Sequence, residues 1–379
     1  IQQHPDFLAL FVYIAMCQFK IDCFEESNDS VDQYLAVNSD SAVALNLKAC
    51  DYLRTFGADT AESQLLQIKK FSSSSYSFVE SLLQHNLVVF HNGLDGFTTL
   101  PKIVDHFPEA RFNLILLYMR ESNSAEAYNL IQDFTPLDPT ELILRATVLL
   151  AYGELTNDTG LIEEASGIFL ELGQLDVVRD TVPGRQCLAT AKFITSEYQD
   201  TMRIFDSIEE FSSGCDEFYY NKGMTLALSQ RWAEAQRYFL LVKNTHYTSE
   251  IFFTSWLCRC YIKNNKPDAA WNLYNEATQS EDAKTLLQII ANDCFLGGFY
   301  YYSMKAYDLL AKFEGDATMR EGMIASAIGV FRGILSRRES SDKLYDVLTT
   351  LASEPEAESV LQTIQSYVEA SGQLDAGGF

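Results

Sequence analysis

The pattern of apolar and polar positions along this chain has the period of amphipathic helices. In residues 255–274, SWLCRCYIKNNKPDAAWNLY, apolar residues recur three or four positions apart on both sides of the polar stretch NNKPD. This spacing puts the apolar side chains on one face of an α-helix, and the polar stretch marks a turn. The pattern therefore predicts two amphipathic helices joined as a hairpin.

The same hairpin pattern recurs through most of the chain. A crowded position in the first helix is followed 12 residues later by Ala, Ser or Thr, and four residues after that by an aromatic or aliphatic residue. One copy, with Ala146 and Ala165, fits only with a loop inserted between its helices. The crowded positions are Ala15, Ala49, Leu87, Ile115, Ala146, Ala189, Gly223, Cys258 and Cys294. Small residues suit this position because the two helices of a hairpin approach most closely there.

The spacing of these positions predicts the fold. Successive crowded positions are on average close to ~34 residues apart, which is the length of the tetratricopeptide repeat. Each such hairpin buries its apolar surfaces by stacking on its neighbours. We therefore predict an all-α fold, a right-handed superhelix of tetratricopeptide repeats (an α-solenoid), with about nine helical hairpins in residues 1–338.

The two ends of the chain depart from the repeat. After Arg338 the period stops, but two amphipathic segments follow, the second with the capping-box spacing of Ser353 and Glu356. We expect residues 339–379 to form C-terminal capping helices and a tail. At the other end, residues 7–19 enter directly as a first helix, so we expect further repeats before residue 1 in the natural protein.

The composition is that of a folded, acidic protein. Of the 379 residues, 47% are hydrophobic and 13% aromatic, and the net charge is -24. Such a chain is too apolar to be disordered, and it is repelled by nucleic-acid phosphates and anionic lipids. We therefore expect no nucleic-acid partner. We also expect no membrane insertion, because the most apolar run, residues 112–119, is too short to span a bilayer.

No motif in the chain predicts catalysis or metal binding. The pair Cys258-x-Cys260 has no second Cys or His pair nearby, and it falls within a helix rather than at a helix start. We interpret the scattered cysteines as reduced thiols in a cytosolic-type compartment. Neither a Walker A loop nor an H-E-x-x-H or G-x-S-x-G sequence occurs. We expect no enzymatic activity, no catalytic residue, no metal and no cofactor.

The repeat register predicts a partner-binding groove. In tetratricopeptide arrays the first helix of each hairpin lines the concave face, at fixed offsets from the crowded position. Aromatic residues and Met at these offsets suit an amphipathic helix laid in the groove. The alternative is that superhelical curvature buries these side chains against neighbouring first helices. The candidate residues are Phe193, Tyr220, Met224, Phe252, Arg259, Ile262 and Phe295.

Several segments carry a resemblance more specific than the repeat. They are ALNLKAC (44–50), HNLVVF (85–90), PEARFNLILLYMR (108–120), TVPGRQC (181–187), residues 255–274 and LLQIIANDCFLGGFYYYSMKAYDLL (286–310). In this order they resemble the tetratricopeptide subunit of intraflagellar transport complex B known as DYF-13 or tetratricopeptide repeat protein 26. The resemblance covers nearly the whole chain, and members of that family are longer at the N-terminus.

The resemblance implies a function that composition and periodicity do not. It implies a non-enzymatic scaffold or adaptor that docks on other core subunits of complex B and helps carry motility-related cargo proteins. The implied location is the cilium or flagellum, the basal body and the cytoplasm. The alternative is a co-chaperone-type adaptor that binds acidic peptide tails through a clamp of Lys and Asn on successive first helices. The candidates for such a clamp, Asn46 and Lys222, do not recur in register.

Overall fold

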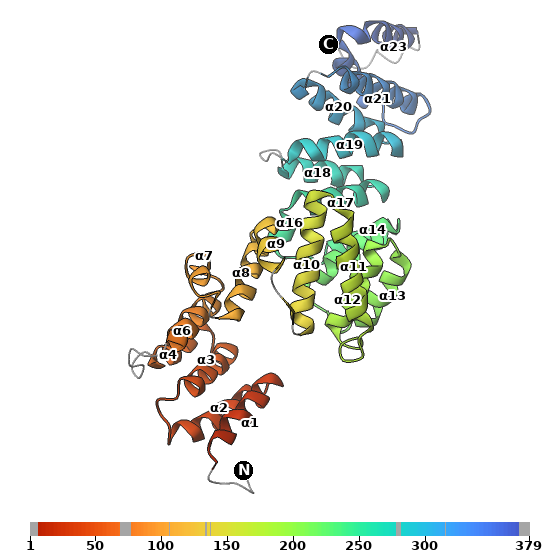
Figure 1. Ribbon diagram of the computed structural model, residues 1–379. Coiled ribbons are helices and arrows are strands. Elements are labelled where there is room, and N and C mark those ends of the chain that lie inside the picture. Colours follow the sequence, from red (N-terminus) through yellow and green to blue (C-terminus); the bar gives the residue numbers. More distant parts are fainter. Residues whose placement is uncertain are drawn as a thin grey trace. The chain divides into compact units, whose positions relative to one another are not determined.

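Helices make up every regular element of the described structure, so the predicted all-α class is confirmed (Figure 1). The computed structural model describes residues 7–68, 77–105, 107–132, 135–136, 138–277, 282–314 and 316–370. The tail expected at residues 371–379 lies outside them. The chain divides into two compact units, Ile1–Val178 and Arg179–Phe379, a division for which the repeat period offers no signal. The boundary at residue 338 between array and cap stays a prediction.

The first unit is a series of helices in which each packs on the next along the chain, as in an α-solenoid. Its elements are α1 (Ala9–Lys20), α2 (Phe24–Leu35), α3 (Ala42–Phe56), α4 (Ala58–Leu65), α6 (Ser77–Phe90), α7 (Gly96–Thr99), the 3₁₀ turn η1 (Leu100–Lys102), α8 (Pro108–Arg120), α9 (Ser124–Gln132), α10 (Pro139–Thr156) and α11 (Thr159–Gln174).

The second unit continues the pattern with helical hairpins followed by single helices. Its elements are α12 (Val182–Ile194), α13 (Tyr198–Ile208), α14 (Asp216–Leu228), α15 (Trp232–Phe239), α16 (Thr245–Thr248), α17 (Ile251–Lys263), α18 (Pro267–Ala277), α19 (Ala283–Gly297), α20 (Tyr300–Glu314), α21 (Ala317–Leu335), α22 (Lys343–Ala352), η2 (Pro355–Ala357) and α23 (Glu358–Ala370). Within the described ranges, no helix is both long and apolar enough to cross a membrane.

Several turns inside the hairpins share one backbone conformation. Asn157 (φ 54°), Ser196 (φ 61°) and Asn265 (φ 60°) each adopt the left-handed conformation that ends a helix. The next residue then donates its N–H back to a carbonyl of the preceding helix, as Lys266 does to Tyr261 at 2.9 Å. The polar stretches that the sequence marks as turns thus end the first helix and satisfy one of its last carbonyl groups.

The predicted crowded positions lie at the contact between the two helices of a hairpin. A Cβ atom added to Gly223 would lie only 3.1 Å from the Phe239 ring. The register is wrong at Leu87, which is half-buried and packs on the core that contains Leu83, whereas the adjacent Val88 is buried in one core with Leu100. There the short α7 passes into a 3₁₀ turn, which changes the rotation per residue. The positions with 0% exposure are Ala15, Ala49, Ile115, Ala146, Ala189, Cys258 and Cys294.

The helices after residue 338 pack on those before it. Val347 and Leu351 of α22 and Ile364 of α23 share one core with Met304 of α20 and Val330 of α21. These helices therefore cover apolar surface that α20 and α21 would otherwise expose to solvent.

Candidate partner-binding surface

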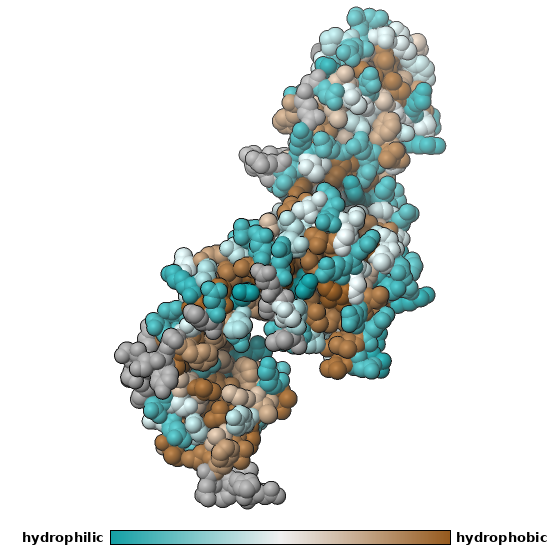
Figure 2. Space-filling view, viewed as in Figure 1, coloured by the Kyte–Doolittle hydropathy of each residue, from teal (hydrophilic) through white to brown (hydrophobic). Residues whose placement is uncertain are grey.

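Polar residues cover much of the visible face, and apolar residues gather in separate patches between them (Figure 2). Exposed apolar patches on soluble proteins are candidate interaction sites. The exposed aromatic residues of the second unit's first helices are therefore the place to test the predicted groove.

One face of α17 carries a strip of two aromatic rings and a cation. Phe252 is 55% exposed, and its ring meets Trp256 edge to face with 6.5 Å between centroids. The Arg259 guanidinium lies over the Trp256 ring, 5.2 Å from its centre. Arg259 Nε also lies 3.6 Å from Asp293 Oδ2 of α19. We call Phe252, Trp256 and Arg259 the α17 strip; its spacing of four and three residues keeps all three on one helical face.

The structure does not bring all the predicted groove residues to the surface. Met224 is 7% exposed and Ile262 is 1% exposed, so the predicted exposure is wrong for these two residues. Met224 shares a core with Phe253, and Ile262 shares one with Leu286. Neighbouring first helices therefore bury both side chains, which is the alternative that the sequence left open.

The remaining groove candidates are half-buried aromatic residues that contact other rings. Phe193 meets Tyr198 at 5.6 Å between centroids, and Phe295 meets Tyr300 at 5.6 Å. Tyr220 stacks on a buried phenylalanine of α17 at 5.9 Å. The sequence missed Trp256, although its spacing from Phe252 and Arg259 on one helical face was a usable signal.

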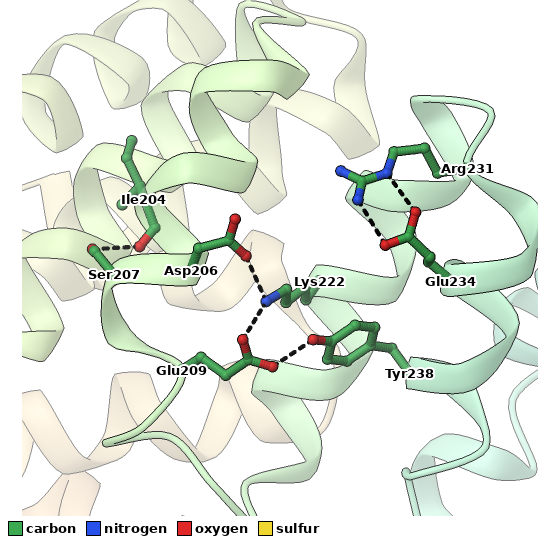
Figure 3. A network of polar contacts seen from close by, with 8 residues as sticks. All are labelled: Ile204, Asp206, Ser207, Glu209, Lys222, Arg231, Glu234 and Tyr238. Atoms are coloured by element: carbon green, nitrogen blue, oxygen red, sulfur yellow. Dashed lines mark hydrogen bonds and ion pairs between the residues drawn. The ribbon is translucent and has the colours of Figure 1, made fainter.

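A polar network joins α13, α14 and α15 around a buried lysine (Figure 3). Lys222 is 2% exposed, and its Nζ lies 2.8 Å from Asp206 Oδ1 and 2.9 Å from Glu209 Oε2. The Tyr238 hydroxyl donates to the other Glu209 oxygen, and the Tyr238 ring lies 4.8 Å from Nζ. Burial lowers the pKa of Lys222, but the hydrogen bonds to the carboxylates outweigh burial and raise it above its usual value. Lys222 is thus neutralised internally and cannot clamp a partner's carboxylate.

A comparison with known protein families identifies the family of this chain. The chain matches the family described as intraflagellar transport protein 56 over residues 1–374. The chain belongs to the intraflagellar transport protein 56 family. Membership supports a role in intraflagellar transport and an association with the cilium. It confirms, at the level of the family, the resemblance to a tetratricopeptide subunit of the transport machinery.

A curated member of the intraflagellar transport protein 56 family extends beyond this chain. The Caenorhabditis elegans intraflagellar transport protein 56 homolog is 26% identical over 390 residues, covering 97% of this chain and 68% of the relative. Among solved structures, the tetratricopeptide domain of P58(IPK) matches 86% of this chain and 99% of its own at 12% identity, with a TM-score of 0.25. A human IFIT1 dimer with m7Gppp-AAAA matches 98% of this chain and 90% of its own chain at 14% identity, with a TM-score of 0.41. These structural scores are too low to support a functional argument.

The paired cysteines of this family member are packing residues. Cys258 and Cys260 are both 0% exposed. Burial raises the pKa of Cys260 to about 12, and it also raises the pKa of Cys258. Thiols with raised pKa values are poor nucleophiles and poor metal ligands. Over the ranges that the structure describes, no group of three or more His, Cys, Asp or Glu side chains is placed to hold a metal ion.

Substitution at Cys258 tests the close helix contact. Cys258→Ala is expected to leave the free energy of unfolding near that of the wild type, because Ala occupies this position in other hairpins. Cys258→Leu is expected to overpack the contact and cost about 1–3 kcal/mol. Urea titration followed by tryptophan fluorescence measures both. Stoichiometric zinc in protein purified without added metal, lost when either cysteine is replaced, would contradict the packing role.

Proposed function

We propose that this chain is a non-enzymatic scaffold subunit of intraflagellar transport complex B, of the DYF-13 type. It docks on other core subunits of the complex and helps carry motility-related cargo proteins into cilia or flagella, and it also resides at the basal body and in the cytoplasm. The observation that carries the proposal is the family match over residues 1–374. The array of helical hairpins supports it, because such arrays offer long binding surfaces.

The α17 strip is the surface that we propose for contact with a complex B partner. Trp, Tyr, Phe and Arg are enriched at protein interfaces and dominate their binding energy. Trp256 is held between Phe252 and Arg259, so it loses little conformational freedom when a partner covers it. Phe193, Tyr220 and Phe295 remain in the proposal as half-buried neighbours on the other first helices. A partner segment with an apolar face suits this strip.

Two features support a scaffold over the other functions. The buried thiols of Cys258, Cys260 and Cys294 have raised pKa values, which suits packing better than nucleophilic catalysis. A co-chaperone-type adaptor needs a free cationic clamp, and Lys222 is occupied by Asp206 and another carboxylate. We therefore favour the scaffold of a transport complex.

Replacing Phe252 tests the α17 strip. Phe252→Asp is expected to keep the helical circular dichroism signal and the melting temperature, because the side chain is exposed. It is expected to reduce the recovery of complex B core subunits from ciliated cells by about tenfold or more. Quantitative mass spectrometry of the purified complex measures the recovery.

A matched control separates this surface from a general effect of charge. Phe313 of α20 is 70% exposed, so Phe313→Asp adds the same charge elsewhere and is expected to keep the partners. If Phe252→Asp retains all complex B subunits, the partner docks on another face. If the wild-type chain recovers none of them, the proposed function itself is wrong.

A further inference from the structure

A groove of about 480 Å³ lies beside the end of α15, between α17, α18 and the start of α19. Its floor is apolar: Phe253 is 3% exposed, Leu257 6% and Leu286 1%. Leu240, which is 54% exposed, and the half-buried Leu273 line it nearer the surface. The groove therefore has a largely covered apolar floor, and Leu240 and Leu273 supply the apolar surface that solvent reaches.

The groove exists because α15 stops early. α15 has 8 residues, whereas α13 and α18, the second helices of the adjacent hairpins, have 11 each. Asp216 Oδ2 accepts hydrogen bonds from the backbone N–H groups of Lys243 at 3.1 Å and Asn244 at 2.6 Å. Asn244 in turn caps α16 by accepting from the His246 N–H at 3.0 Å. These bonds fix the course of the chain after α15, and Leu240 and Val242, which follow α15 directly, line the groove.

The same bonds fix the backbone beside the groove in the free chain. Asp216 belongs to α14, which forms a hairpin with α15, so it ties the segment after α15 to the first helix of that hairpin. A preformed surface costs little ordering entropy on binding. The missing turn of α15 can therefore be replaced by a helix from outside the chain, which would pack on the same floor.

The charges at the groove define what such a helix must carry. The charged side chains that line it are Glu276 and Asp282, and no Lys or Arg is among its described lining residues. The whole chain carries a net charge of -24. A helix flanked by acidic residues would be repelled, whereas Lys or Arg beside the apolar stripe would pair with the two carboxylates.

We propose that the groove at α15 binds an amphipathic helical segment of another protein, with an apolar stripe flanked by Lys or Arg. This is helix-in-groove recognition, in which apolar residues at helical spacing enter the groove and charges select the partner. The groove is distinct from the α17 strip, because none of the three strip residues lines it, whereas Phe253, next to Phe252 in the chain, forms its floor. The inference goes beyond the proposed function and can fail while that function stands.

Three designed 18-residue peptides test the proposal with the whole chain. The first has a Leu stripe at helical spacing and Lys on its polar face, the second has the same stripe with Glu, and the third has the Lys composition with the stripe scrambled. Fluorescence anisotropy measures their binding. The striped Lys peptide is expected to bind about tenfold or more tightly than either of the others. Equal binding of the striped and scrambled Lys peptides would overturn the proposal, because it would reflect charge alone.

Variants then locate the bound peptide. Leu240→Asp is expected to weaken binding of the striped Lys peptide by about tenfold or more, because it places a charge beside the apolar stripe. The control Phe211→Asp, at a 76% exposed residue outside the groove, is expected to leave binding unchanged. If Leu240→Asp binds as tightly as Phe211→Asp does, the proposal is overturned.

Charge reversal provides the sharpest test. Glu276→Lys with Asp282→Lys is expected to invert the preference, so that the striped Glu peptide binds better than the striped Lys peptide. Reversal of two exposed residues outside the groove, Glu210→Lys with Glu321→Lys, changes the net charge equally and is expected to leave the preference unchanged. If both pairs shift the preference equally, only the net charge matters and the groove is not the site.

Self-association of the chain is a separate outcome. If the chain self-associates and Leu240→Asp abolishes the self-association, a second copy fills the groove, which also overturns the proposal.

Discussion

Phe239→Ala is expected to lower the free energy of unfolding of the second unit by about 3–5 kcal/mol, because it opens a cavity in a fully packed contact. Phe239 is 1% exposed and meets Phe253 edge to face, with 5.5 Å between centroids. Its ring also fills the space above Gly223, where a Cβ atom would come within 3.1 Å. Denaturant titration followed by tryptophan fluorescence reads this unit alone, because all three tryptophans lie in it.

A double-mutant cycle with Gly223 sharpens this expectation. Gly223→Val alone is expected to overpack the contact and cost about 1–3 kcal/mol. In the Phe239→Ala background, the same valine enters the vacated space, so its cost is expected to vanish or reverse. Strictly additive effects would contradict the close packing of these two residues. Phe313→Ala, at an exposed position, is the control and is expected to change stability by less than about 0.5 kcal/mol.

Asp51→Asn is expected to stabilise the first unit at neutral pH, because the wild-type carboxyl group is buried. Asp51 is 1% exposed, and Ser27 Oγ lies 2.9 Å from its Oδ2 and 3.0 Å from the Ala15 carbonyl oxygen. The hydroxyl has a single proton and can donate to only one of the two. A protonated Asp51 satisfies the geometry by donating to Ser27, which then donates to Ala15. Burial raises the pKa of Asp51 from 3.8 to about 6, which agrees with this arrangement.

The raised pKa sets the sign and the pH window. As pH rises from about 4 to about 6, the unfolded chain releases the Asp51 proton before the folded chain does, so wild-type stability falls. Asn has no proton to lose, so the advantage of Asp51→Asn grows from near zero at pH 4 to at most about 3 kcal/mol above pH 6. Hydrogen exchange of the α1–α3 amides, corrected for intrinsic rates, measures it. Asp40→Asn, at an exposed residue, is expected to show no such trend, and a constant advantage at all pH values would contradict the mechanism.

The fold was largely predictable because its rules are local. A hairpin needs one crowded position in each helix and a turn that can end the first helix. Those requirements are met by residues such as Ala189 and Ser196, which are seven positions apart. The register failed at Leu87, where a 3₁₀ turn replaces a regular second helix. Helical periodicity could not anticipate that change of rotation.

The surface was less predictable, because exposure depends on the neighbouring hairpin. Met224 and Ile262 stand at offsets that the repeat assigns to the concave face, yet the next first helix covers both. Phe252 stands at another offset that the repeat assigns to the concave face, and it remains exposed. The sequence pattern of a single helix does not distinguish these cases, because the distance and rotation between successive hairpins decide them.

By itself the sequence determined the all-α class and the register of most hairpins, because short-range spacing carries that information. It also determined the resemblance to an intraflagellar transport family, which particular segments of the chain carry. Only the tertiary structure decided which polar groups are satisfied and where apolar surface stays open. Lys222 hydrogen-bonds to the carboxylates of Asp206 and Glu209, at and just after the end of the preceding helix. Asp51 hydrogen-bonds to Ser27, 24 residues earlier in the chain. Asp216 fixes the segment that follows α15 by accepting from backbone N–H groups 27 and 28 residues later. Such contacts depend on how helices stack in space, and the period of a sequence does not encode the partner of an individual side chain.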